Sequence, residues 1–223
     1  SYIVSGSAGA LAYGPWNITT QFVLIAIPLF IFMGELLLRI GLSDRLYVGA
    51  AAALGKLPGG LLHANVGSCA IFSAISGSSA ATAATIGTVA IPELEKRGYE
   101  HKMVLGSLAA GGTLGILIPP SIVMIIYGSM TGQSIGKLFI AGTIPGILLL
   151  LLFMSYIVIA SIKTPGLAPG HKQLPIKQTI LRIVNMWPIG LIMFIVLGGI
   201  YMGMTTPTEA AAIGATTALI FGL

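Results

Sequence analysis

Charged residues are almost absent from long stretches of this chain, and this constrains its fold more than any other feature. Only 8% of the 223 residues are Asp, Glu, Lys or Arg, 56% are hydrophobic, and the mean hydropathy is +0.98. Because ordinary soluble domains contain roughly 25% charged residues, this chain has too few polar side chains to cover a water-exposed surface. It is predicted to be an all-α membrane protein, a polytopic helical bundle in which about six segments match a ~30 Å hydrocarbon core.

Three continuous apolar segments, 22–40, 138–162 and 186–204, are long enough to be membrane-spanning helices. A polar connection is expected around 39–56. A further helix is predicted to begin at 206–209, where the sequence TPTE has the pattern of a capping box with proline at the first helical position. The chain begins without Met and ends within this apolar pattern, so we expect 1–223 to be one transmembrane domain from a longer protein.

The net charge of +5 reflects membrane topology rather than a nucleic-acid partner, because the eleven Lys and Arg residues lie in short loops. If the weakly polar segment 61–92 crossed the membrane once, these residues would divide seven to four between the two sides. If it turns back at 76–79, ten lie on one side and only Lys137 on the other. The positive-inside rule favours the second arrangement, a re-entrant helical hairpin over about 61–92 with a cytoplasmic loop over about 163–182.

The hairpin tip is the first candidate binding element. Its arms, 61–75 and 80–92, are shorter than the ~20 residues needed to span, so the tip is expected near mid-membrane. Irregular backbone at that depth must be buried in protein or line a cavity. The hydroxyls of Ser76, Ser78 and Ser79, with the positive N-terminal end of the second short helix, suit an anion.

A discontinuous helix is the second candidate element. The apolar stretch 103–127 is interrupted by the sequence GGTLG at 111–115 and again by the pair Pro119-Pro120, where a helix cannot continue unperturbed. Carbonyl groups and a half-helix C-terminus at such a break can hold a small hard cation. Glycine and serine could also serve only to bring helices close together, but two breaks facing one site favour a binding role.

Five sequence runs resemble the large membrane subunit of tripartite ATP-independent periplasmic (TRAP) transporters. The resemblance extends from about residue 22 to the end of the chain. The runs are IPLFIFMGEL at 27–36, LPGGLLHANV at 57–66, ISGSSA at 75–80, GILIPPSI at 115–122 and TTPTEAAA at 205–212.

This resemblance implies an elevator-type transporter that moves a small organic anion, such as a dicarboxylate or sugar acid, inward with sodium. It also implies a small membrane subunit and an extracytoplasmic substrate-binding protein as partners, and the cytoplasmic membrane of a bacterium or archaeon as the location. The chain corresponds to roughly the N-terminal half of such a subunit, and a second hairpin is expected after it. We expect the anion to be bound by Asn65, Gly77, Ser78 and Ser79, and sodium by Ser76, Ser78, Gly112, Thr113, Gly115 and Pro119.

Three other functions were weighed from the same residues. An intramembrane serine protease could use Ser78 or Ser79, but no histidine or lysine is placed to act as its base. A channel with a re-entrant selectivity loop, or another ion-coupled anion transporter with a similar hairpin, remains an alternative. The sequence has no Walker-type loop, metal-ligand cluster or dinucleotide fingerprint, so we expect no enzymatic activity and no cofactor besides the coupling ion.

Overall fold

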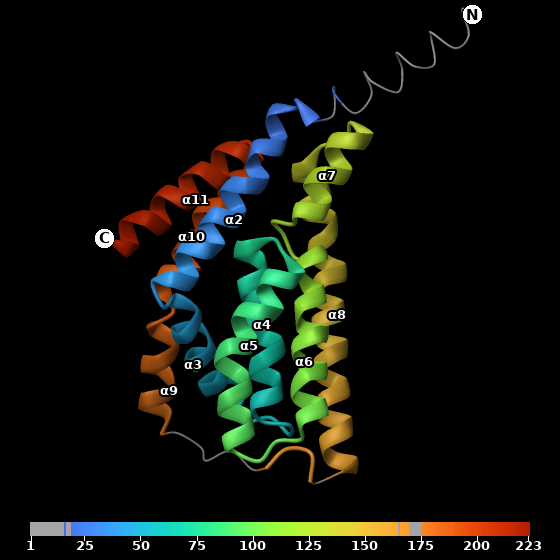
Figure 1. Ribbon diagram of the computed structural model, residues 1–223, viewed down its shortest axis with the longest axis vertical. Helices are drawn as coiled ribbons and strands as arrows, with labels where there is room; N and C mark the ends of the chain where they lie inside the picture. Colours follow the sequence, from blue (N-terminus) through green and yellow to red (C-terminus); the bar gives the residue numbers. More distant parts are fainter. Residues whose placement is uncertain (1–15, 17–18, 165, 170–174) are drawn as a thin grey trace, which may run out of the picture.

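The computed structural model describes residues 16, 19–164, 166–169 and 175–223, and all the regular elements among them are helical (Figure 1). The all-α prediction is confirmed. The elements are η1 (Phe22–Ile25), α2 (Ala26–Arg39), α3 (Leu42–Leu54), α4 (Leu61–Ser76), α5 (Ser79–Lys96), α6 (His101–Thr113), η2 (Leu114–Ile116), α7 (Ile122–Thr131), α8 (Ile135–Lys163), α9 (Ile176–Val184), α10 (Trp187–Tyr201) and α11 (Pro207–Gly222).

The helices form two groups that lie side by side (Figure 1). In the first, which we term the hairpin bundle, α4, α5, α6 and α8 stand roughly parallel, and η2 and α7 continue above α6. In the second, the crossing bundle, η1, α2, α10 and α11 run obliquely beside the upper half of the first. Helix α3 leads from α2 to α4 and also packs against α9, which joins α10 at a bend of 45°.

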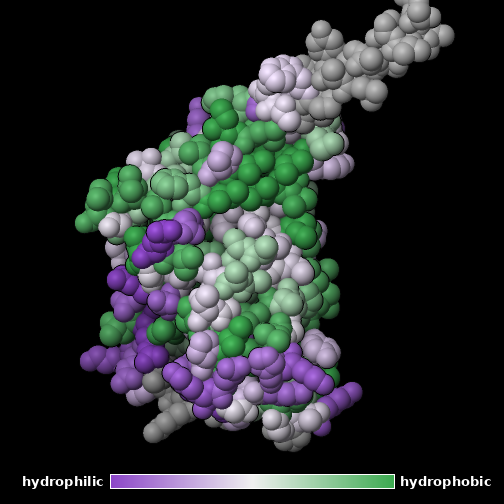
Figure 2. All heavy atoms as spheres, in the orientation of Figure 1, coloured by the Kyte–Doolittle hydropathy of each residue, from purple (hydrophilic) through white to green (hydrophobic). Residues whose placement is uncertain are grey.

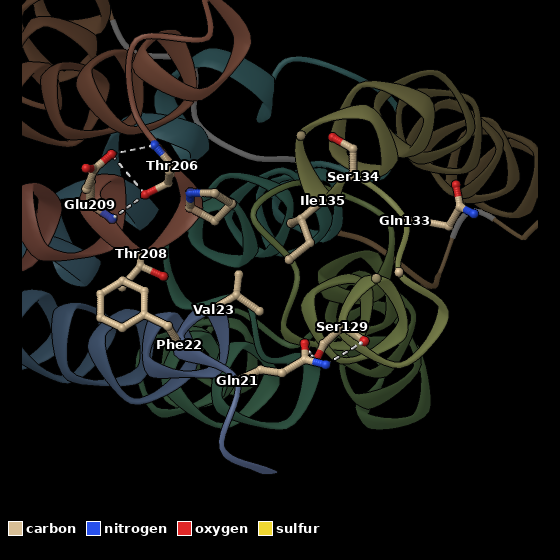
Figure 3. A pocket seen from close by; sticks show the side chains of 14 residues that line it. Gln21, Phe22, Val23, Ser129, Gln133, Ser134, Ile135, Thr206, Thr208 and Glu209 are labelled. Carbon is tan, nitrogen blue, oxygen red and sulfur yellow. Dashed lines mark hydrogen bonds between the residues drawn. The ribbon is translucent and has the colours of Figure 1, made fainter. Parts of the chain in front are cut away.

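A pocket of about 580 Å³ lies between the two bundles at the upper end of the molecule (Figure 3). One wall is the turn between α7 and α8, and the other is formed by the starts of η1 and α11. Its lining combines apolar side chains such as Phe22 and Ile135 with amides and hydroxyls, which are those of Gln21, Ser129, Gln133, Ser134, Thr206 and Thr208.

Helix α4 is the centre of the hairpin bundle. All of its residues except Ile71 are buried, including the polar His63, Asn65 and Ser68. A helix buried on every side is expected where neighbours surround it, and α4 contacts α2, α3, α5, α6 and α8. Its many small residues permit these close approaches, so α4 positions the tip that follows it.

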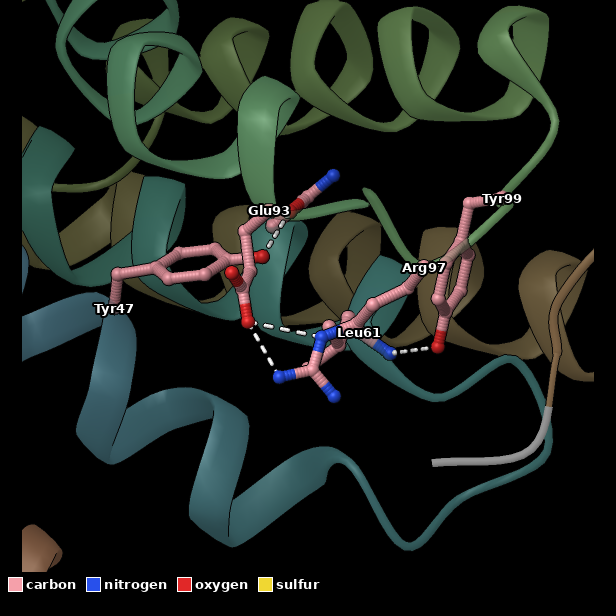
Figure 4. Close-up of polar contacts among 6 residues, drawn as sticks. Tyr47, Leu61, Glu93, Arg97 and Tyr99 are labelled. Carbon is pink, nitrogen blue, oxygen red and sulfur yellow. Dashed lines mark hydrogen bonds and ion pairs between the residues drawn. The ribbon is translucent and has the colours of Figure 1, made fainter. Parts of the chain in front are cut away.

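The two ends of the hairpin are joined to each other (Figure 4). The backbone N–H of Leu61, at the start of α4, donates to the buried hydroxyl of Tyr99, just after α5, at 3.1 Å. Beside them, Arg97 pairs with Glu93 on the last turns of α5. Hydrophilic residues gather at this lower end of the visible face and along its left edge, whereas hydrophobic residues cover much of the upper part (Figure 2). The hairpin therefore starts and ends in the same polar region.

Most predicted segments correspond to observed helices. The spans at 22–40 and 138–162 match η1 with α2 and α8, which are long and apolar enough to cross a membrane, and 186–204 matches α10, which meets that test together with α9. The discontinuous helix is confirmed, because α6 ends at Thr113 and α7 begins only at Ile122. The capping box is confirmed too, since the Glu209 N–H donates to the Thr206 hydroxyl and the Thr206 N–H donates to the Glu209 carboxylate.

The polar connection expected around 39–56 is wrong, because most of it is helix α3. Leu46, Tyr47 and Ala50 form a buried stripe on this helix, which packs against α4. Polar residues such as Asp44 and Arg45 interrupt the apolar pattern in the sequence, so the segment resembled a loop. The buried stripe can be recognised only when α4, the helix it packs against, is in place.

Two other boundaries differ from the prediction. Part of the loop expected over 163–182 is helix α9, while residues 165 and 170–174 lie outside the part of the chain that the structure describes. Helix α5 continues past 92 to Lys96, with the exposed Pro92 inside it. With 18 residues α5 is about 27 Å long, nearly enough to cross the hydrocarbon core, so the length of this arm is weak support for a hairpin that turns back. The hydrogen bond that joins the two ends of the hairpin is the stronger support.

We expect cysteines introduced at Lys56 and Lys96 to be labelled from the same side of the membrane, because the hydrogen bond between Leu61 and Tyr99 holds the two hairpin ends together. The measurement is labelling by a membrane-impermeant thiol reagent in right-side-out and inverted vesicles, with Cys69 replaced by alanine. Lys137→Cys is the control and should label from the other side. Labelling of positions 56 and 96 from opposite sides would rule out the hairpin.

Candidate functional site

The hairpin tip is a short irregular turn with its own bracing. Helix α4 ends at Ser76, Gly77 adopts φ +63°, and α5 begins after Ser78, whose hydroxyl accepts from the Ala81 N–H at 3.4 Å. The Ser76 hydroxyl lies 2.9 Å from the Thr82 hydroxyl, with which it shares a buried hydrogen bond. A left-handed φ favours glycine, so Gly77 is suited to reversing the chain within one residue.

The tip contacts the break in the discontinuous helix directly. The N–H of Ile122, the first residue of α7, donates to the Gly77 carbonyl at 3.1 Å. A Cβ atom on Gly77 would lie 3.0 Å from the carbonyl oxygen of Pro120. The two breaks expected from the sequence therefore meet, and each satisfies part of the other's backbone, as a membrane interior requires.

Glycines on the second element bring its backbone against the first turn of α5. A Cβ atom on Gly115 would lie 3.0 Å from the Ser79 nitrogen and 3.2 Å from the Ser78 carbonyl carbon. One on Gly112 would lie 3.1 Å from the Ser79 carbonyl oxygen and 2.9 Å from the Ala83 Cβ. These distances are shorter than ordinary contacts, so the approach depends on the missing side chains.

A third element reaches the tip from the crossing bundle. Gly34 of α2 packs on Ser76 so closely that an added Cβ would lie 3.1 Å from the Ser76 Cβ. Both bundles thus contact the tip, and a shift of one bundle against the other would change its surroundings.

Ser121 is a site residue that sequence reasoning missed. It immediately precedes α7, is fully buried, and its hydroxyl has no hydrogen-bond partner among the described residues. A buried hydroxyl without a partner is costly and marks a position where a bound group could be coordinated. The signal in the sequence was a serine directly after Pro119-Pro120, where a new helix must start.

The structure brings most of the predicted site residues together. Ser76, Gly77, Ser78 and Ser79 form the tip, Gly112 and Gly115 pack on it, and Pro119 is buried in the segment that leads to Ile122. Ser78 and Ser79 are partly exposed, whereas Ser76 is buried. The arrangement offers hydroxyl and carbonyl oxygens beside the N-terminal end of α5.

Thr113 and Asn65 are not brought to the tip. The Thr113 side chain is exposed, and its hydroxyl donates to the Ala110 carbonyl of its own helix at 2.7 Å. Asn65 lies roughly three helical turns before Ser76. Its amide accepts from the Tyr47 hydroxyl at 3.1 Å and donates to the Ser107 hydroxyl at 2.8 Å, so it ties α4 to α3 and α6. Both side chains are engaged in interactions that the sequence does not reveal.

The groups at the tip are suited to coordinating a ligand. The Ser78 hydroxyl caps α5 and has no hydrogen bond to a histidine or lysine among the described residues. The same part of the chain holds no group of three or more His, Cys, Asp or Glu side chains that could bind a metal ion. A ligand at the tip would meet neutral oxygens and the positive end of a helix dipole.

A membrane bundle in which a helical hairpin meets a broken helix has the architecture of a membrane transport protein. The chain belongs to the family described as "Tripartite ATP-independent periplasmic transporter, DctM component", whose model matches residues 6–223. The resemblance to TRAP large permeases is thereby confirmed, and the family makes the chain part of a multi-pass membrane protein.

Several curated relatives are similar over most of the chain. It is 41% identical over 211 residues to the C4-dicarboxylate TRAP transporter large permease protein DctM of Pseudomonas aeruginosa, covering 94% of this chain and 48% of that protein. It is 43% identical to the isethionate TRAP transporter permease protein DctMQ of Oleidesulfovibrio alaskensis and 37% identical to the sialic acid TRAP transporter permease protein SiaT of Haemophilus influenzae, covering 91% of this chain and 32% of each relative. The chain spans about half or less of the length of these relatives.

Replacing Gly115 by alanine is expected to destabilise the protein by about 1–3 kcal/mol, because the new Cβ would press on backbone atoms of Ser78 and Ser79 that cannot rotate away. The matched control is Gly106→Ala in α6, where no atom lies within 4 Å of the added Cβ and helix propensity should improve by up to about 1 kcal/mol. The measurement is the thermal unfolding midpoint of each purified full-length protein. Equal midpoints for both variants would contradict the close contact at the tip.

Proposed function

We propose that this chain is part of the large permease subunit of a sodium-coupled TRAP transporter that takes up a small organic anion, such as a dicarboxylate or sugar acid. The observation that carries the proposal is the direct contact between the hairpin tip and the break of the discontinuous helix, which Ile122 and Gly77 make. Because the chain spans about half the length of its DctM relative, the proposal concerns the whole protein that contains it.

An anionic substrate is supported by the start of α5. The first backbone N–H groups of a helix and its dipole favour negative charge, and the partly exposed Ser78 and Ser79 add hydroxyl groups there. The printed names of three relatives point the same way, since C4-dicarboxylates, isethionate and sialic acid all carry an acidic group.

A sodium ion is supported by the oxygens on both sides of the contact. The hydroxyl groups of Ser76 and Ser78 belong to one side, and the backbone of Gly112 and Gly115 belongs to the other. Ser121, next to Ile122, adds a buried hydroxyl that has no hydrogen-bond partner among the described residues. Neutral hard oxygens suit a small monovalent cation better than a soft metal. The charge of a bound cation would in turn favour an anion at the adjacent end of α5, which would couple the two binding events.

The proposed partners and location follow from the family. A TRAP large permease acts with a small membrane subunit and an extracytoplasmic substrate-binding protein, in the cytoplasmic membrane of a bacterium or archaeon. The end of the molecule that carries the hairpin ends would face the cytoplasm, since it holds most of the basic residues.

Uptake is expected to be saturable, to require an inward sodium gradient and to require the binding protein. The measurement uses the full-length subunit reconstituted with its small membrane subunit in liposomes, with radiolabelled C4-dicarboxylate and radiolabelled sialic acid as probes. A potassium gradient of equal size is the control. Concentrative uptake by the large subunit alone would contradict the proposed partners. An ohmic current would indicate a channel. Uptake that does not depend on sodium would contradict sodium as the coupling ion.

Ser78→Ala and Ser121→Ala are each expected to raise the sodium concentration for half-maximal uptake by roughly threefold to tenfold, the loss expected for one oxygen ligand. Thr113→Val is the matched control, because its hydroxyl is bonded to its own helix and should leave sodium dependence unchanged. Ser78→Gly removes the hydroxyl but costs the α5 cap only a few tenths of a kcal/mol, so it separates ion binding from helix stability. Unchanged sodium dependence in both alanine variants would place the ion elsewhere.

A further inference from the structure

The pocket at the upper end of the molecule is bordered by a direct polar link between the two bundles (Figure 3). The Ser129 hydroxyl of α7 donates to the Gln21 side-chain oxygen at 2.6 Å, and the Gln21 side-chain N–H donates to the Ser129 carbonyl at 3.3 Å. One amide group thus uses both its acceptor and its donor on a single residue 108 positions away. Ser129 is 7% exposed, so this pair is partly shielded from water.

A second link joins the same two bundles between α8 and α10. The hydroxyl oxygens of Thr143 and Tyr201 lie 3.0 Å apart. The Thr143 hydroxyl also lies 3.0 Å from the Phe139 carbonyl, which can only accept. Since a hydroxyl has one proton, Thr143 donates to Phe139 and Tyr201 donates to Thr143. Tyr201 ends α10 shortly before α11 begins at the pocket, so both links are near the end opposite the hairpin ends.

These links are of a kind that can open and close. Neutral hydrogen bonds contribute little net stability in contact with water, because water replaces either partner when they separate. The adjoining pocket of about 580 Å³ is lined by amides and hydroxyls together with apolar side chains such as Phe22 and Ile135, and it gives water that access at the link between Gln21 and Ser129. The lower end differs, since there the bundles are joined through the packed helices α3 and α9.

The pocket itself is a poor site for the anionic substrate. Its lining contains no Lys or Arg, and it includes Glu209, whose carboxylate is bonded to Thr206. An anion would meet a negative charge there without a compensating cation. The pocket is better explained as the space beside a contact that separates.

We propose that Gln21 with Ser129, and Thr143 with Tyr201, form a reversible clasp that holds the two bundles together at the extracytoplasmic end and opens in each transport cycle. The proposal rests on the proposed transport function. Opening would widen the pocket and shift the hairpin bundle against α2, where Gly34 packs on Ser76. The clasp residues would then act as positioning residues that set which side of the membrane the tip faces.

The first test cross-links the clasp. Gln21→Cys with Ser129→Cys, in the full-length transporter with Cys69 replaced by alanine, is treated with a short bifunctional methanethiosulfonate that spans about the length of the glutamine side chain. Uptake is expected to fall at least tenfold and to recover after dithiothreitol. The matched control is Gln133→Cys with Lys137→Cys, which links two exposed residues within the hairpin bundle and outside the clasp and should leave uptake unchanged. Full uptake by the cross-linked clasp would overturn the proposal.

The second test does not depend on transport and so separates failure of the clasp from failure of the proposed function. Spin labels are placed on the exposed positions 137 of α8 and 204 after α10, and their distance distribution is measured by pulsed electron paramagnetic resonance. We expect two distances, with Ser129→Ala raising the population of the longer one by about threefold to tenfold. Gln133→Ala is the control and should not change the populations. A single distance that Ser129→Ala leaves unaltered would overturn the clasp even if the protein transports normally.

Discussion

The close approach of two interrupted helices is the constraint on which the rest of the structure depends. A turn at Gly77 and a break before Ile122 each leave backbone groups that a membrane interior cannot satisfy, and the hydrogen bond between these residues meets part of that need. The approach is possible only because Gly112 and Gly115 present no side chain to the start of α5. The burial of α4 on nearly every side follows, since neighbours must surround the hairpin to hold its tip in place.

The same contact connects the fold with the proposed transport function. Hydroxyl and carbonyl oxygens from two separate elements lie on either side of it, so a cation held there would stabilise the pairing, and the adjacent end of α5 favours an anion. Binding of the ion would then make binding of the substrate more favourable, and binding of the substrate would strengthen binding of the ion by the same free energy. The tip also packs against Gly34 of α2, so the position of the crossing bundle affects the surroundings of the tip.

The two bundles are held together by different forces at their two ends. Packed helices join them at the lower end, whereas neutral hydrogen bonds supplement the packing of α7 and α8 on the crossing bundle at the upper end. Apolar packing must be lost as a unit, but a hydrogen bond can be exchanged for water at small net cost. A relative motion of the bundles is therefore expected to begin at the upper end, with α3 and α9 as the connections that guide it.

The sequence by itself determined the membrane class, the continuous spans, the position of both breaks and the family, because hydropathy, proline, glycine and capping patterns act locally. Only the tertiary structure decided which residues pack against these segments and which groups their side chains bond. It made α3 a helix by giving Leu46 and Ala50 a surface to pack on, and it directed Thr113 back to its own helix and Asn65 to Tyr47 and Ser107. It also buried Ser121 with no hydrogen-bond partner in the part of the chain that the structure describes. Side-chain partners of this kind depend on which helices become neighbours, and that information is spread over the whole chain.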